Sequence, residues 1–499
     1  MKVLIVTGTL AAPVLSEVIK NIKDVEIKLK VLNYPVASLM STKFIAENLK
    51  QSNLRNIDYI LLPGLVYGDA KVIEEVTGIK TYKGTEEAWD LPKVIEALKK
   101  GTQLSTTEPA DKIINQIENT EDKLKAIEKE AKIAFELNGI RIPIRPPPFR
   151  VFLEVDSKQN VEEIERVKRN IDVVVLGFPV GHFDLDEVRH KVKELVDKGY
   201  VVGIDAESPR ELKEGVKTGA SIVFNLNEFN IEELEEIKKE SAFVVAPFSV
   251  ENKGEITVKL INKAKDKGYD RLIADPILSP PLKGLVNSII DYKYVREKLP
   301  ETPILMGILN VSELIDADSI GVNAVLTAIA GELGIANLLI MEKGKTRGSS
   351  WELSQATKMI SIALKENRLP KDLGIDLLIL KDKRRYRENV KADIVVNGNI
   401  EPIMDESGFA KIFVSNDGFG VEWIGKDKIV IKGKDGLSIG RTLIRRVRNI
   451  SSEHALYIGY ELAKAEIAYQ LDKNYIQDKP LFKKIRNENF DTEHNGKES

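Results

Sequence analysis

Residues 201–226 read VVGIDAESPRELKEGVKTGASIVFNL, which is a short apolar strand, a helical pattern and a second strand. Eight strand-like runs of this kind follow one another along the middle of the chain, each before a helical pattern. Eight such units over about 215 residues predict a closed (β/α)8 TIM barrel, with an open doubly wound sheet as the second choice. The runs are Val151–Val155, Asp172–Gly177, Val201–Asp205, Ile222–Leu226, Phe243–Ala246, Arg271–Asp275, Ile304–Leu309 and Asn337–Met341.

Before the barrel, strand and helix patterns alternate, which predicts an N-terminal α/β domain with a small parallel sheet over residues 1–105. The turn Thr7-Gly8-Thr9 follows the first strand and precedes a helix. Its backbone amides are placed to hold an anion at the helix N-terminus, although a tight turn required by the fold explains it equally simply. The expected strands are Lys2–Val6, Ile27–Val31, Tyr59–Leu62 and Lys80–Tyr82.

Residues 106–149 are predicted to form a helical connector that ends in a proline-rich linker. Helical spacing extends over 107–137, and Arg141–Pro148 contains three consecutive prolines, which favour an extended chain. We expect the functional site in the barrel at 150–368, because the flanking domains carry no specific motif. Its longer crossover helices are expected at Asp184–Lys198, Val250–Lys267 and Ser350–Lys365.

After the barrel, short β-like runs separated by glycine-containing turns predict an antiparallel α+β domain over residues 369–484. A helix is expected at Glu453–Leu471, and the polar residues 485–499 are expected to be disordered. The expected strands are Leu377–Leu380, Ile394–Val396, Lys411–Val414, Gly420–Trp423 and Lys428–Ile431.

Composition excludes several classes of chemistry. The chain has no cysteine, so disulfides, thiolate metal sites and cysteine nucleophiles are excluded. Its 74 Lys and Arg against 77 Asp and Glu give no electrostatic reason to expect a nucleic-acid partner. No apolar segment is long enough to span a membrane, and the first residues lack the features of a signal peptide, so we expect a cytoplasmic protein. The abundance of Lys, Glu and Ile is typical of proteins from hot environments.

Polar residues stand where four of the predicted strands end. They are Asp205, Asn225, Asp275 and Asn310. In a TIM barrel the carboxyl ends of the strands form the active-site face, so these groups are expected to converge there. Singly, each has an ordinary explanation, such as a helix cap, a turn or a loop before Pro276. Jointly, two carboxylates and two amides suit a heterocycle with an amide beside a guanidine-like edge, which a pterin has.

The same strand ends resemble the motifs of the pterin-binding barrel superfamily, which contains dihydropteroate synthases and methyltetrahydrofolate methyltransferases. The matching runs include Ile204-Asp205, Phe224-Asn225, Ala274–Leu278 and Met306–Ser312. The resemblance implies that Asp205, Asn225 and Asp275 hydrogen-bond a reduced pterin. With its flanking domains, the whole chain resembles archaeal dihydropteroate-synthase-related proteins associated with methanopterin. The family also implies a homodimer.

Two transferase reactions remain open for this site. A synthase condenses a hydroxymethyl-dihydropterin diphosphate with an arylamine in folate or tetrahydromethanopterin synthesis. It needs groups for the departing diphosphate, and we assign these to Lys345, Arg347 and Ser349 of the basic loop 343–350, with Mg²⁺ as a possible cofactor. This is our first expectation. The chain departs from the synthases at Asn310-Val311-Ser312-Glu313, where those enzymes carry a Ser-Arg-Lys motif.

The alternative is methyl transfer from an N5-methyl-tetrahydropterin, with a corrinoid protein or domain as the possible acceptor. Methyltransferases of the superfamily have a Gly-x-x-Asn-Val-Ser motif on the seventh strand, and the resemblance implies that Asn310 contacts N5. Asn310 and Asp275 are therefore the expected catalytic residues. His182 and His454 are weaker candidates, and no protein metal site is predicted. A non-catalytic pterin-binding protein is the third possibility.

Overall fold

The computed structural model describes residues 1–50, 52, 54–115, 120–381, 392–396, 400–403, 405–426 and 428–482. By its internal contacts the chain divides into two compact units, Met1–Lys383 and Arg384–Ser499. None of the described helices is long and apolar enough to cross a membrane.

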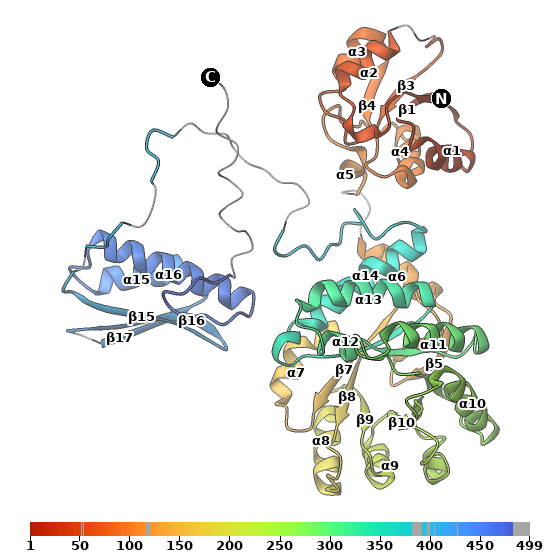
Figure 1. Cartoon of the computed structure of the whole chain (residues 1–499), viewed down its shortest axis with the longest axis vertical. Coiled ribbons are helices and arrows are strands. Elements are labelled where there is room, and N and C mark those ends of the chain that lie inside the picture. The colour runs from red at the N-terminus through yellow and green to blue at the C-terminus, as the bar shows by residue number, and fades with distance from the viewer. Residues whose placement is uncertain are drawn as a thin grey trace. The chain divides into compact units, whose positions relative to one another are not determined.

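The first unit begins with a four-stranded parallel sheet in the order β2-β1-β3-β4, as predicted (red to orange in Figure 1). Alternate residues of β1 face opposite sides, so the sheet has two cores. Val3 and Ile5 pack with α1 and α4, while Leu4 and Val6 pack with α2 and α3. The elements are β1 (Lys2–Thr7), α1 (Ala12–Lys20), β2 (Glu26–Val31), α2 (Thr42–Leu49), β3 (Tyr59–Leu62), α3 (Lys71–Thr77), β4 (Lys80–Lys83) and α4 (Leu91–Lys99).

The predicted barrel is confirmed. Its eight strands are all parallel, in the order β12-β11-β10-β9-β8-β7-β14-β13, and a bridge from Ala274 to Ile304 joins the two ends of this order. Helices surround the strands (Figure 1). The strands are β7 (Arg150–Asp156), β8 (Val173–Gly177), β9 (Val201–Asp205), β10 (Ile222–Leu226), β11 (Ala242–Val245), β12 (Leu272–Ala274), β13 (Leu305–Gly307) and β14 (Asn337–Met341). The helices are α7 (Val161–Val167), α8 (Leu185–Asp197), α9 (Pro209–Thr218), α10 (Lys253–Asp266), α11 (Leu285–Lys298), α12 (Leu309–Ser312), α13 (Ser319–Leu333) and α14 (Ser349–Glu366).

Strand periodicity decides which side chains enter the barrel. Phe152, Val175 and Phe224 belong to the interior core, whereas Val151 and Val174 pack beneath the helices. Because side chains alternate every second residue, the next inward position on β7 after Phe152 is Glu154. The interior therefore changes from apolar to polar at the carboxyl ends of the strands.

The connector differs from the prediction. Helices α5 (Ala110–Asn115) and α6 (Thr120–Glu130) are followed by an antiparallel hairpin of β5 (Ile133–Leu137) and β6 (Ile140–Pro143). The predicted helix is thus wrong beyond Glu130, because the Asn138-Gly139 turn and its flanking apolar residues favour a hairpin. Leu137 and Ile142 pack into the interior core, so this segment plugs the barrel instead of forming a free linker.

The second unit is an antiparallel sheet of β15 (Gly408–Ser415), β16 (Gly418–Gly425) and β17 (Lys428–Gly433), with α15 (Gly436–Arg446) and α16 (Ser452–Gln470). The three corresponding strand predictions and the last helix are confirmed. The predicted strands at Leu377–Leu380 and Ile394–Val396 are wrong, since neither run has a strand partner among the described residues and their apolar side chains are exposed. The predicted tail 485–499 lies outside the described residues.

Candidate functional site

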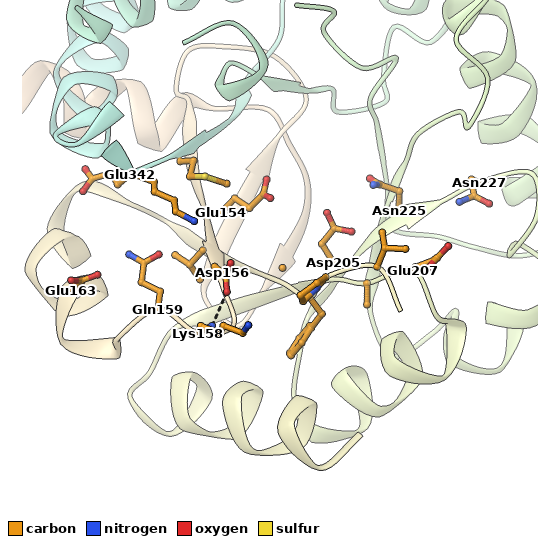
Figure 2. Close-up of a pocket in the computed structure, with 18 of the residues that line it drawn as sticks. Glu154, Asp156, Lys158, Gln159, Glu163, Asp205, Glu207, Asn225, Asn227 and Glu342 are labelled. Carbon is orange, nitrogen blue, oxygen red and sulfur yellow. Dashed lines mark hydrogen bonds between the residues drawn. The ribbon is translucent and has the colours of Figure 1, made fainter. Parts of the chain in front are cut away.

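A cavity of about 830 Å³ opens where the strands end. Its walls come from the ends of β7, β8, β9, β10 and β14 and from the loops that follow them. This volume lies in the usual range for small-molecule sites, and the carboxyl face is where TIM barrels bind ligands. Figure 2 shows the polar side chains that line it.

Asp205 and Asn225 meet in this cavity, as predicted from their neighbouring strands. Asp205 ends β9 and lies in register with Phe224, the residue before Asn225 on β10. Burial raises the pKa of Asp205 to about 6. Within the described part of the chain, neither the Asp205 carboxylate nor the Asn225 amide has a side-chain hydrogen bond. Both groups are therefore available to a ligand.

Glu154 is the residue that the sequence analysis missed. It projects from β7 into the cavity, and Figure 2 shows Asp205 between Glu154 and Asn225. Burial raises the pKa of Glu154 to about 7, and the nearby charges of Asp205 and Glu313 add to this effect. Gly177 lies beside it on the adjacent strand, where a Cβ would make an ordinary van der Waals contact of 3.7 Å with Glu154 Oε1. A lone glutamate at an inward position of an otherwise apolar strand was the available signal.

Asp275 has a different environment. It is buried, and its Oδ1 accepts hydrogen bonds from Tyr292 Oη at 2.6 Å and from the backbone N of Ile277 at 2.8 Å. Burial raises its pKa to about 6 although both hydrogen bonds oppose the rise. Asp275 does not line the cavity. Because its Oδ1 accepts both hydrogen bonds, only its Oδ2 remains for the predicted pterin contact.

Asn310 lies on α12 with its amide turned toward the loop after β12. Its Nδ2 donates to the carbonyl of Leu278 at 3.0 Å, and the residue does not line the cavity. The structure therefore brings the four predicted residues together as two pairs. Asp205 and Asn225 share the cavity, while Asp275 and Asn310 hold the loop 275–279.

The predicted phosphate-binding residues of the loop 343–350 make other contacts. Lys345 Nζ lies 2.8 Å from Asp316 Oδ1, and Arg347 Nε donates to the carbonyl of Gly344. Ser349 is fully buried, where its hydroxyl accepts from Asn323. These three residues do not line the cavity, so their predicted role gains no support. The lysines that do line it are Lys158 and Lys343.

The cavity is predominantly acidic. Two lysines face six carboxylates, which are Glu154, Asp156, Glu163, Asp205, Glu207 and Glu342. Among the described residues no group of three or more acidic or histidine side chains is arranged to hold a metal ion. A Mg²⁺ ion would therefore depend on oxygen ligands supplied by the substrate, and it stays a prediction.

The two candidate histidines, His182 and His454, both have carboxylate partners. His182 Nδ1 lies 2.7 Å from Glu211 and its Nε2 lies 2.9 Å from Glu187. Both carboxylates raise the pKa of His182, and their hydrogen bonds with its ring hold the rim loop beside Phe178. In the second unit, His454 Nδ1 lies 3.1 Å from Asp405.

The raised pKa of Glu154 can be tested by measuring how the stability of the protein depends on pH. Its pKa is about 7 in the folded chain against an ordinary 4.5, so the folded state binds more protons between these values and loses stability as pH rises through them. We expect Glu154→Gln to stabilise the protein by about 1–3 kcal/mol at about pH 8 and to have no effect near pH 4. Thermal unfolding at both pH values measures this. The exposed Glu163→Gln is the control, and an equal gain in it would refute the assignment.

Comparisons with known proteins follow the division of the chain. Residues 1–86 match the model of a family of unknown function, DUF6513, and residues 397–478 match the model PterinBD-DUF4346. The "Uncharacterized protein MJ0107" of Methanocaldococcus jannaschii is 32% identical, over 97% of this chain and 99% of its own length.

Solved structures of similar fold include dihydropteroate synthases. One from Yersinia pestis with a pterine-sulfa conjugate is 14% identical over 46% of this chain and 99% of that chain, with a TM-score of 0.37. One from Thermus thermophilus in complex with 6HMPPP is 15% identical over 43% of this chain and 97% of that chain, with a TM-score of 0.34. At these TM-scores the likeness supports no inference about activity.

The fold is a closed parallel (β/α)8 barrel, and the model named PterinBD-DUF4346 matches the chain in the C-terminal domain, outside this barrel. The chain belongs to the family of the protein from Methanocaldococcus jannaschii, which it matches along nearly its whole length.

Proposed function

We propose that the protein is a pterin-dependent transferase that binds a reduced pterin in the cavity at the barrel mouth. The observation that carries this proposal is the row of Glu154, Asp205 and Asn225, whose polar groups enter the cavity without a hydrogen-bond partner among the described residues. The three residues are half-buried, and a ligand that fills the cavity would shield their polar groups from water, so it would need complementary donors and acceptors.

A pterin offers the complementary groups. Its guanidine-like edge presents parallel N–H donors, which a carboxylate accepts in pairs, and its adjacent amide matches an Asn side chain that both donates and accepts. A donor-rich edge beside Asp205 favours the ionised carboxylate and lowers its pKa from about 6. Binding would then be strongest where Asp205 is ionised.

Of the two reactions, we favour methyl transfer from an N5-methyl-tetrahydropterin. When the methyl group leaves as a formal cation, the electrons of the N5–C bond remain on nitrogen, and a proton on N5 makes that nitrogen the better leaving group. Glu154, with a pKa of about 7, is suited to hold that proton at neutral pH. Asn310 keeps a supporting role through Leu278. We also propose that the methyl group is accepted by a corrinoid on a protein or domain.

The synthase reaction is the second candidate, because Lys158 and Lys343 line the cavity and are able to contact a diphosphate. The surrounding carboxylates weigh against it. Six acidic side chains around two lysines repel a departing diphosphate unless Mg²⁺ bridges the charges.

Calorimetric titration separates the two candidates. We expect a methyl-tetrahydropterin to bind at least about tenfold more tightly than a hydroxymethyl-dihydropterin diphosphate in the presence of Mg²⁺. The reverse preference, dependent on Mg²⁺, would support the synthase. If neither compound binds, the pterin assignment is wrong.

A further inference from the structure

A second cavity, of about 350 Å³, lies in the N-terminal domain at the carboxyl edge of its sheet. Loops after β1, β3 and β4 form its walls. The chain passes from β1 to its neighbour β2 through α1 on one face, and from β2 to β3 through α2 on the other. In open parallel sheets, small molecules bind outside the strand ends at this point of reversal, between β1 and β3.

One end of this cavity is suited to an anion. Leu10 and Ala11 line it and lead directly into the nine-residue helix α1. Ala11, at the N-cap, offers no side-chain acceptor to the free N–H groups of the first turn, and that turn contains no acidic residue. Pro13, in the first turn, has no N–H, so the backbone N–H groups of Ala12 and Val14 are the donors of this helix end, together with its partial positive charge.

Thr7 provides an independent indication of a ligand. Its side chain is only 1% exposed and lines the cavity. Within the described residues its hydroxyl has no hydrogen-bond partner, although its backbone carbonyl accepts from Leu32. The residue is buried and its hydroxyl borders the cavity, so a ligand oxygen beside the start of α1 would supply the missing hydrogen bond.

The rest of the cavity has an apolar part and an acidic part. Its floor and sides are apolar, with Leu10 and Leu65 partly exposed above the opening. Glu86 and Glu87 lie on the opposite side, and Lys371 reaches the rim with its Nζ 2.6 Å from Glu87 Oε1. Carboxylates beside an apolar wall suit sugar hydroxyls next to a flat ring, as in other sites of this topology.

We propose that the N-terminal domain binds a nucleoside monophosphate, or a phosphate ester of the same build, in this cavity. The phosphate lies at the start of α1 with Thr7, the ring packs between Leu10 and Leu65, and the sugar hydroxyls face Glu86 and Glu87. This site is separate from the barrel cavity and independent of the reaction proposed there.

The test is titration of the full chain with adenosine, guanosine, cytidine and uridine 5′-monophosphates. We expect at least one to bind, and the matching nucleoside and inorganic phosphate each to bind at least about tenfold more weakly, because each lacks half of the contacts. Thr7→Val, which keeps the side-chain shape, should weaken the nucleotide by about fivefold or more. Leu65→Glu should weaken it by at least about tenfold through charge repulsion.

Two controls locate the ligand. Leu39→Glu adds the same charge at an exposed residue of this domain that does not line the cavity, and it should leave the affinity unchanged. Asp205→Asn, in the barrel, should also leave it unchanged. The proposal is overturned if no monophosphate binds up to about 1 mM, if the nucleoside binds equally well, or if Asp205→Asn abolishes binding.

Discussion

Asp205→Asn is expected to weaken pterin binding by about 1.5–3 kcal/mol, which is roughly 10- to 150-fold in Kd. The substitution keeps the size of the side chain but replaces a charged acceptor with a neutral amide, one half of which is a donor. That donor would face the N–H groups of the pterin edge. Calorimetry with the ligand that binds the wild-type protein measures the change.

The control for Asp205 removes the same charge from the same cavity. Glu163→Gln lies at the exposed edge of the site, and it should change the affinity by less than about threefold. Equal affinity of Asp205→Asn and wild type would remove Asp205 from the site. Asp275→Asn provides a further contrast, because it disturbs the hydrogen bond from Tyr292 and should lower thermal stability as well as affinity.

Arg296→Ala is expected to destabilise the barrel by about 3–5 kcal/mol. Arg296 is buried, and its two Nη atoms donate to backbone carbonyls at 2.8–3.3 Å from several segments. Burial lowers its pKa to about 10, so it is still charged at neutral pH. Alanine would leave these buried carbonyls unpaired and open a cavity. The acceptors are Ile144, Leu299, Pro300, Thr302 and Gly334.

Denaturant unfolding, with hydrogen exchange of β7 and β14 to report on the barrel, measures the effect of Arg296→Ala. Arg189→Ala is the matched control. Arg189 has two carboxylate partners, Asp186 and Glu214, but its side chain is 52% exposed, so its loss should cost less than about 1 kcal/mol. One of the acceptors of Arg296 is Ile144 of the proline-rich segment. Similar losses of stability for the two variants would mean that Arg296 does not hold this segment to the barrel.

Sequence periodicity located the elements but not all of their partners. All eight barrel strands follow from short apolar runs at regular spacing, because burial of a parallel strand on both faces requires apolar residues throughout. The hairpin at Ile133–Pro143 was missed, since charged residues at helical spacing continue up to its first strand. Leu377–Leu380 was mistaken for a strand because apolar residues alone do not supply a hydrogen-bonding neighbour.

For the site, position along the chain predicted that four strand-end residues converge, and the structure brings Asp205 and Asn225 together in the cavity because adjacent parallel strands end at the same edge. It could not separate them from Asp275 and Asn310, whose polar atoms are engaged by Tyr292 and Leu278. These partners are distant in sequence, and only packing brings them within hydrogen-bonding distance.

The barrel, the parallel N-terminal sheet and the strand ends that carry polar groups could be predicted from the sequence, because strand and helix periodicities are local properties. Tertiary structure alone decided which groups face the cavity. Glu154 enters it because β7 closes beside β8 and β14 with Gly177 as its neighbour. The acidic charge of the cavity, on which our proposal of methyl transfer rests, follows from the strand ends and loops that closure of the barrel brings together.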